Sequence, residues 1–174
     1  MTNSQTRMLT YINQAMNTAI NILLNDGWSE QEVYAKLERA MDVYLELDAL
    51  VRDDGSGSWG PDSWTANRCW EWSVPGEVMS NWIANGGPVL PFNNSPTLFD
   101  MLPWETIDCP EYFAKVADLE NQLATELREV NINGWAEVMD AAADEARNRL
   151  PDTSGPFQIP LILILIGLFA WNRG

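Results

Sequence analysis

The feature that most constrains this chain is a run of apolar residues near its C-terminal end. From Ile159 to Trp171 no side chain is polar. Exposing so much apolar surface to water carries a large free-energy cost. The run must therefore lie in a bilayer, inside a partner or oligomer, or in the core of the protein itself.

A membrane is the environment that the composition of this run favours. As an α-helix the run would extend about 20 Å, whereas a hydrocarbon core is about 30 Å thick, so it is short for a full transmembrane helix. Its Ile, Leu and Phe side chains each gain about 0.3–0.6 kcal/mol on insertion, and no charge opposes them. We expect residues 159–174 to be a tail that anchors the protein in a membrane or partner through Ile159, Leu161, Ile162, Leu163, Ile164, Leu165, Ile166, Leu168, Phe169 and Trp171.

Two other interpretations of the tail stay open. It can be bundled with other copies at the centre of a soluble homo-oligomer, or it can be a core helix or strand, because alternating Leu and Ile have high β propensity. Arg147 and Arg149 precede the tail and Arg173 follows it. This distribution of positive charge favours the body on the cytoplasmic side.

The overall charge excludes several classes of function. The chain has 25 acidic against 10 basic residues, a net charge of −15, and no histidine. A basic nucleic-acid-binding surface and docking on anionic lipid by a polybasic patch are therefore not expected. Without histidine the chain lacks the commonest general base and metal ligand. We expect no nucleic-acid partner, no cofactor and no metal site.

The two cysteines, Cys69 and Cys109, do not form a motif. They are too far apart in sequence for a metal-ligand or redox pair. They can form a disulfide in an oxidising compartment or remain two buried thiols in a reducing one, and we interpret them as thiols.

Apolar residues at three- and four-residue spacing predict two helical hairpins. The first comprises residues 1–54, with a helix over 4–25, a turn containing Gly27, and a second helix that begins at a Ser29–Glu32 capping box and reaches residue 52. The second comprises residues 110–150, interrupted at Asn133 and Gly134. The expected fold is mainly α, and the two antiparallel hairpins can form a four-helix bundle. The apolar stripes are expected at Met8, Ile12, Ala15, Met16, Ala19, Ile20 and Leu23; Val33, Leu37, Ala40, Met41, Tyr44, Leu45 and Val51; Phe113, Val116, Leu119, Leu123, Leu127 and Val130; and Trp135, Val138, Met139, Ala142, Ala146 and Leu150.

Between the hairpins, residues 55–109 form a long arm rich in Trp, Pro and Gly, in which only Pro75–Ala84 predicts a short helix. Its aromatic content argues against disorder, and long irregular segments in compact domains are usually functional. Tryptophan is enriched at protein interfaces. We therefore expect partner contacts at Trp59, Trp64, Trp70, Trp72, Trp82 and Trp104. The alternative is that a segment rich in loops uses these large side chains to hold itself in place. Residues 151–158 are the linker to the tail.

Catalytic chemistry is sparse in the sequence. Glu71, Glu77 and Glu105 lie among tryptophans, where burial could raise a carboxyl pKa as in glycosidases, or where a sugar could bind. The alternative is that these glutamates are ordinary acids of the surface or of helix N-termini, with no catalytic or binding role. A small carboxylate-based hydrolase or sugar-binding module stays open as a lesser alternative, but we expect no catalytic residue and no small-molecule substrate.

These features together predict a non-enzymatic structural or accessory subunit of a larger assembly. The helical body would present the arm to protein subunits, and the tail would anchor it in membrane lipid or in a partner. Subunits of membrane complexes and components of virions both fit this description, and a soluble homo-oligomer is an alternative.

Overall fold

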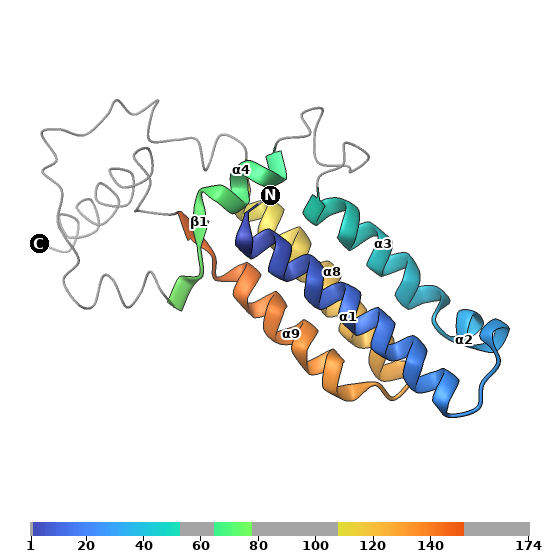
Figure 1. The fold of residues 1–174 in the computed structure, drawn as a ribbon. Helices are drawn as coiled ribbons and strands as arrows, with labels where there is room; N and C mark the ends of the chain where they lie inside the picture. The colour runs from blue at the N-terminus through green and yellow to red at the C-terminus, as the bar shows by residue number, and fades with distance from the viewer. Residues whose placement is uncertain (1, 53–64, 78–107, 152–174) are drawn as a thin grey trace, which may run out of the picture.

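The computed structural model describes residues 2–52, 65–77 and 108–151. This part of the chain is mainly α-helical, as the sequence predicted (Figure 1). Its elements in chain order are α1 (Asn3–Asn25), α2 (Glu30–Lys36), α3 (Glu38–Arg52), α4 (Thr65–Glu71), β1 (Ser73–Val74), α8 (Cys109–Glu129), α9 (Asn133–Arg147) and β2 (Leu150–Pro151).

Local hydrogen bonds define both ends of α1. At its start, the Thr2 hydroxyl accepts from the backbone of Gln5, and the Gln5 side chain accepts from the backbone of Thr2. At its end, Gly27 has a φ of 96°, and the next backbone amide bonds back to the Leu23 carbonyl. This left-handed glycine is the turn that the sequence predicted.

The second predicted helix begins at the expected capping box but is broken near its middle. Ser29 and Glu32 bond to each other's backbone amides. The helix is interrupted at Leu37, which separates α2 from α3. Val33 and Leu37 are both buried, and α2 lies across the end of α1 beside the connecting turn (Figure 1).

The turn between α8 and α9 lies earlier than the sequence predicted. The residue with left-handed backbone is Asn131, with a φ of 63°, and Ile132 donates to the Leu127 carbonyl. Asparagine tolerates this conformation better than most residues. Asn133 and Gly134, expected to interrupt the helices, instead form the first turn of α9.

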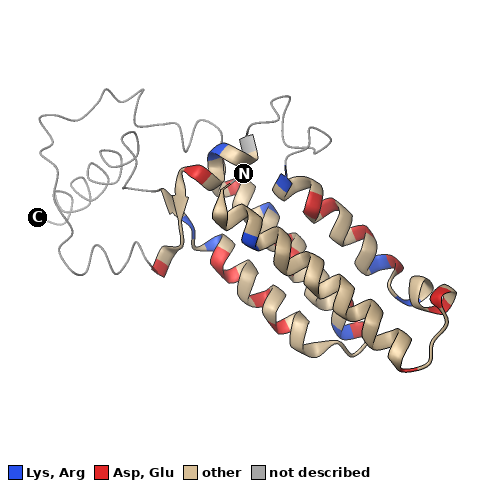
Figure 2. Cartoon of the chain, viewed as in Figure 1, with Lys and Arg blue, Asp and Glu red and all other residues tan. Residues whose placement is uncertain are grey.

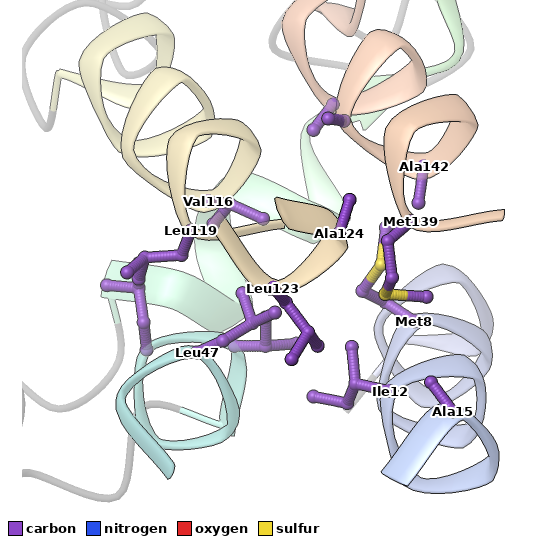
Figure 3. Packing of buried hydrophobic residues seen from close by; sticks show 14 of the residues in the cluster. Met8, Ile12, Ala15, Leu47, Val116, Leu119, Leu123, Ala124, Met139 and Ala142 are labelled. Atoms are coloured by element: carbon purple, nitrogen blue, oxygen red, sulfur yellow. The ribbon is translucent and has the colours of Figure 1, made fainter. Parts of the chain in front are cut away.

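The helices α1, α3, α8 and α9 share one hydrophobic core. α1 packs against α3 and α9, and α8 packs against the same two helices. Figure 3 shows side chains from all four helices pointing toward one another. Those labelled there are Met8, Ile12 and Ala15 of α1, Leu47 of α3, Val116, Leu119, Leu123 and Ala124 of α8, and Met139 and Ala142 of α9.

Most predicted stripe residues are buried or partly buried, but three are exposed. Leu45 is 56% exposed, Val138 36% and Leu150 38%. Val138 directly precedes the buried Met139, so it points away from the core on the same helix. The sequence pattern was wrong at these three positions.

Two short elements were missed within the predicted irregular arm. α4 spans seven residues, and β1 pairs antiparallel with β2, with Ser73 opposite Pro151 and Val74 opposite Leu150. Gly76 and Glu77 are helical, within the short helix predicted from Pro75. Residues 53–64, 78–107 and 152–174, which include the tail, lie outside the described residues.

Candidate functional site

The most elaborate side-chain arrangement in the described structure lies where α4, β1, β2 and the start of α8 meet. We call the residues Cys69, Trp70, Ser73, Cys109 and Arg149 the junction. Cys69 and Cys109 are fully buried and form a disulfide that joins α4 to the first residue of α8. The interpretation of these cysteines as thiols was therefore wrong, because the fold brings together residues that are distant in sequence.

Trp70 connects the junction to the core. Its ring packs edge-on against Phe113, with 4.9 Å between ring centroids. Its indole Nε1 donates to the Tyr112 hydroxyl at 3.1 Å, and that hydroxyl donates to the Leu50 carbonyl at 2.9 Å. Both polar atoms of these buried rings are thus satisfied, as burial requires.

Arg149 is buried against both Trp70 and Phe113. Its guanidinium carbon lies 4.7 Å from the Trp70 ring centroid, within cation–π range. Nε donates to the Ser73 hydroxyl at 2.8 Å, and a terminal nitrogen contacts Glu145 at 3.3 Å. Burial lowers the pKa of Arg149 to about 10, with Glu145 acting in the opposite direction and Arg7 adding to the decrease. The guanidinium thus stays charged at neutral pH.

The junction holds close together three parts of the chain that are followed or preceded by residues that the structure does not describe. Glu77 precedes residues 78–107, Asp108 follows them, and Pro151 precedes the tail. The disulfide holds α4 to α8, and the β1–β2 pair holds the segment before Glu77 to Pro151. The described ends of the arm and the tail therefore lie at the same end of the helices (Figure 1).

The predicted contact tryptophans have different locations. Trp70 is only 2% exposed and belongs to the core, and Trp72 is partly buried against it. Trp70 therefore has no surface to offer a partner, contrary to expectation. Trp59, Trp64, Trp82 and Trp104 lie outside the described residues. Within residues 2–52, 65–77 and 108–151, the large aromatic side chains that are exposed were not singled out from the sequence. They are Trp28, 41% exposed with the Lys36 ammonium 4.0 Å from its ring centroid, and Tyr34, 63% exposed.

A cavity of about 720 Å³ lies between the end of α9 and the segment after β1. Arg7 and Glu145 form a salt bridge at its wall, and Arg147, which also lines it, pairs with Asp118. Gly76 approaches the Asn148 carbonyl so closely that no Cβ would fit. The lining residues are Arg7, Pro75, Gly76, Glu77, Ala141, Asp144, Glu145, Arg147, Asn148 and Leu150.

The three glutamates considered for catalysis are not brought together by the described structure. Glu77 is exposed and lines the cavity. Glu71 does not line it and pairs with Arg68 at 3.1 Å. Glu105 lies outside the described residues. The residues that are described hold no cluster of three or more potential metal ligands.

Glu120 is a buried acid that the sequence analysis missed. It is 0% exposed on α8, and neither carboxyl oxygen has a hydrogen-bond partner. Burial, and then the charge of Glu145, raise the pKa of Glu120 well above its ordinary value, while Arg147 opposes the shift. Its position could have been noticed, because it falls on the same face of α8 as Val116 and Leu123.

Gln5 is a second buried polar residue, and its hydrogen bonds are satisfied. Its side-chain nitrogen donates to the Val51 carbonyl at 2.6 Å and to the Asn67 side chain at 2.8 Å. It thereby connects α1 with the end of α3 and with α4, close to the junction.

Comparison with protein-family models, with curated proteins and with solved structures finds no match to this chain. In the described ranges, none of the helices combines the length and the apolar character needed to cross a bilayer. The tail residues expected to act as the anchor fall outside those ranges.

Proposed function

We propose that this protein is a non-enzymatic structural or accessory subunit of a larger assembly. The helices α1, α3, α8 and α9 act as a four-helix bundle that serves as a rigid support. The arm and the tail act from one end of that support, the arm on protein subunits and the tail in membrane lipid or in an apolar partner. The observation that carries this proposal is the junction region, where the disulfide joins α4 to the start of α8 and the β1–β2 pair joins Ser73 and Val74 to Pro151 and Leu150, so that residues 78–107 and the segment leading to the tail start from neighbouring points.

The composition of the two attached segments supports the same function. Residues 78–107 contain only two charged side chains, Asp100 and Glu105, and residues 153–172 contain none, in a chain with a net charge of −15. Segments so poor in charge and rich in large apolar side chains are suited to a surface that excludes water. Fixing their ends lowers the conformational entropy that binding must overcome.

The disulfide supports placing the body in an oxidising compartment. Protein disulfides form and persist outside the cytosol and are rare within it. We therefore propose an extracytoplasmic location or the outside of a virion for the body, in place of the cytoplasmic side that the arginines near the tail favoured.

Truncation before the tail tests the proposal. We expect the full chain to float with neutral phosphatidylcholine vesicles in a density gradient, and a variant lacking residues 156–174 to remain in the aqueous fraction. Both should keep the same helical circular dichroism, because α1, α3, α8 and α9 bury one another's apolar side chains in a shared core. A matched control replaces Leu163 and Leu165 with Ser in the full-length chain and should weaken flotation.

Two outcomes would contradict the anchoring role. If removal of residues 156–174 unfolds the helices, the tail is part of the core. If the full chain also stays in the aqueous fraction, the tail is bound to protein, and a soluble oligomer or a protein host becomes the better explanation.

The hydrolase alternative has less support. Of its three glutamates, Glu77 alone lines the described cavity. The Glu145 carboxylate in that cavity already accepts from Arg7 and Arg149. A Glu77→Gln variant that lost activity on a chromogenic glycoside hydrolysed by the wild type would revive this alternative.

A further inference from the structure

The helix α1 differs from its neighbours in charge. It has a single charged residue, Arg7, in 23 positions. The segment from α2 to α3 has six acidic residues against three basic ones, α8 has five against two, and α9 four against one. Figure 2 shows α1 almost entirely without charged residues, between α3 and α9, which both carry several acidic positions in red.

One face of α1 is nevertheless exposed along its length. Most exposed residues follow one another at intervals of three and four positions, so they form a stripe on a single side of the helix. Arg7 lies at the edge of this stripe and is paired with Glu145 of α9. We call this stripe the α1 face; its members are Asn3, Thr6, Thr10, Gln14, Asn17, Asn21 and Leu24. The last of them is 37% exposed, and the neighbouring Ile22 is 39% exposed. A face that were merely solvated would be expected to carry charges in so acidic a chain.

The chemistry of the α1 face suits a second copy of itself. Each Asn and Gln amide carries both donors and an acceptor, and the Thr hydroxyls can accept as well, although the Thr10 hydroxyl already donates to the Thr6 carbonyl. A surface of such groups can satisfy its own copy, whereas an acidic surface repels its copy. Two chains of net charge −15 repel each other least where their contacting surfaces carry no acidic side chain, and α1 has none.

The geometry of a helix face supports the same occupant. Most homo-oligomers are two-fold symmetric dimers, in which one patch contacts its own copy. An antiparallel pair of α1 helices would also place each N-terminus beside a C-terminus, which is the favourable arrangement of their dipoles. Asparagine at such a seam fixes the register and the oligomeric state of paired helices.

We propose that the α1 face is a self-association surface, through which two copies of this chain pack their α1 helices antiparallel with the crossing near Gln14 and Asn17. The contact is separate from the arm and the tail, so it would operate whether or not those segments are anchored.

Isosteric charge substitutions test this surface. In the Gln14→Glu/Asn21→Asp variant each dimer gains four negative charges across the seam, and we expect the dimer dissociation constant at low salt to rise about tenfold or more. The matched control is Gln122→Glu/Asn133→Asp, which makes the same chemical changes at exposed positions of α8 and α9. The control should dimerise with the same dissociation constant as the wild type. Added salt should bring the dissociation constants of the two variants closer together, because it screens the introduced charges.

The measurement is sedimentation velocity of the full chain over a range of concentrations in a mild detergent, which keeps the tail soluble. As a second readout, p-benzoylphenylalanine at position 17 should photo-crosslink to α1 of another copy. A chain that stays monomeric at about 100 µM, where a dimer even of micromolar affinity would be populated, would overturn the proposal. So would association that both variants preserve equally, or crosslinks outside α1, because these outcomes would place the contact in the tail or elsewhere.

Discussion

The disulfide of the junction gives the largest stability effect that the structure allows us to calculate. Cys69 and Cys109 are 40 positions apart. Closing a loop of about 40 residues restricts the unfolded chain by about 13 cal/mol/K, which corresponds to about 4 kcal/mol at 25 °C. A domain of this size is usually stable by about 5–15 kcal/mol, so the bond would supply a large part of the total.

The perturbation is made in two ways, because each has a different side effect. Reduction of the wild type with a phosphine leaves both sulfurs in place. The Cys69→Ala/Cys109→Ala variant also removes their buried volume, so it should be less stable than the reduced wild type. Reduction should lower the free energy of unfolding in urea by about 4 kcal/mol in the absence of any native-state strain, and the double Ala variant should lower it further.

Two signals followed together show how the loss is distributed. Far-ultraviolet circular dichroism reports the long helices, and the near-ultraviolet signal of the nine tryptophans includes that of Trp70, next to the bond. If both signals change in one transition shifted to lower urea, α4 belongs to the same cooperative unit as the helices. The reasoning is refuted if the free energies of unfolding of the reduced and oxidised proteins differ by less than about 1 kcal/mol and the near-ultraviolet signal is unchanged. Neither the entropy of the loop nor the packing of α4 would then depend on the bond.

Two buried ionisable residues predict further changes in stability. Because the raised pKa of Glu120 lets the native state keep a proton that the unfolded state releases, the wild-type free energy of unfolding should fall as pH rises from about 4.5 toward the folded-state pKa. Glu120→Met should remove this pH dependence and raise the free energy of unfolding at pH 7 by about 1–3 kcal/mol. As a control, Glu137→Met at an exposed position of α9 should change the free energy of unfolding by less than about 0.5 kcal/mol. Urea titrations between pH 4 and 8 check both variants. Arg149→Met should lower the free energy of unfolding by about 3 kcal/mol, because the buried Ser73 hydroxyl and carbonyl lose the hydrogen bonds that Arg149 donates. Arg149→Lys should restore only part of this stability, since an ammonium cannot reproduce the planar set of donors of a guanidinium. An Arg149→Met variant as stable as the wild type, with an unchanged near-ultraviolet spectrum, would show that the contacts of Arg149 contribute nothing to stability.

The helices were predictable because their signals are local. Periodic apolar residues mark the buried face of α8 from Phe113 to Leu127, and the Ser29–Glu32 capping box marks the start of α2. Gly27 ends α1 by its left-handed backbone. These features depend on residues within about four positions of one another, so the sequence alone displays them.

The junction was not predictable because its signals are long-range. Nothing near Cys69 indicates that Cys109 lies beside it. Trp70 resembles the other tryptophans of the arm, and only its contacts with Phe113 and Arg149 identify it as a core residue. The seven residues of α4 are too few to show helical periodicity, and their position depends on the same distant contacts.

The distribution of buried polar groups explains what the junction adds to an apolar core. Apolar side chains can slide by a helical turn and still be buried, so packing by Leu and Met alone specifies the register of helices weakly. Gln5 and Arg149 are different, because each is satisfied only when specific atoms of another element face it. One end of the helices holds the disulfide and the polar bonds from Gln5, Arg149 and Trp70, close to the last described residues before the undescribed segments. The turn between α1 and α2, at the opposite end, is held by a capping box and by backbone hydrogen bonds. We infer that register is specified most strongly where the chain must hold its attached segments in a fixed relation.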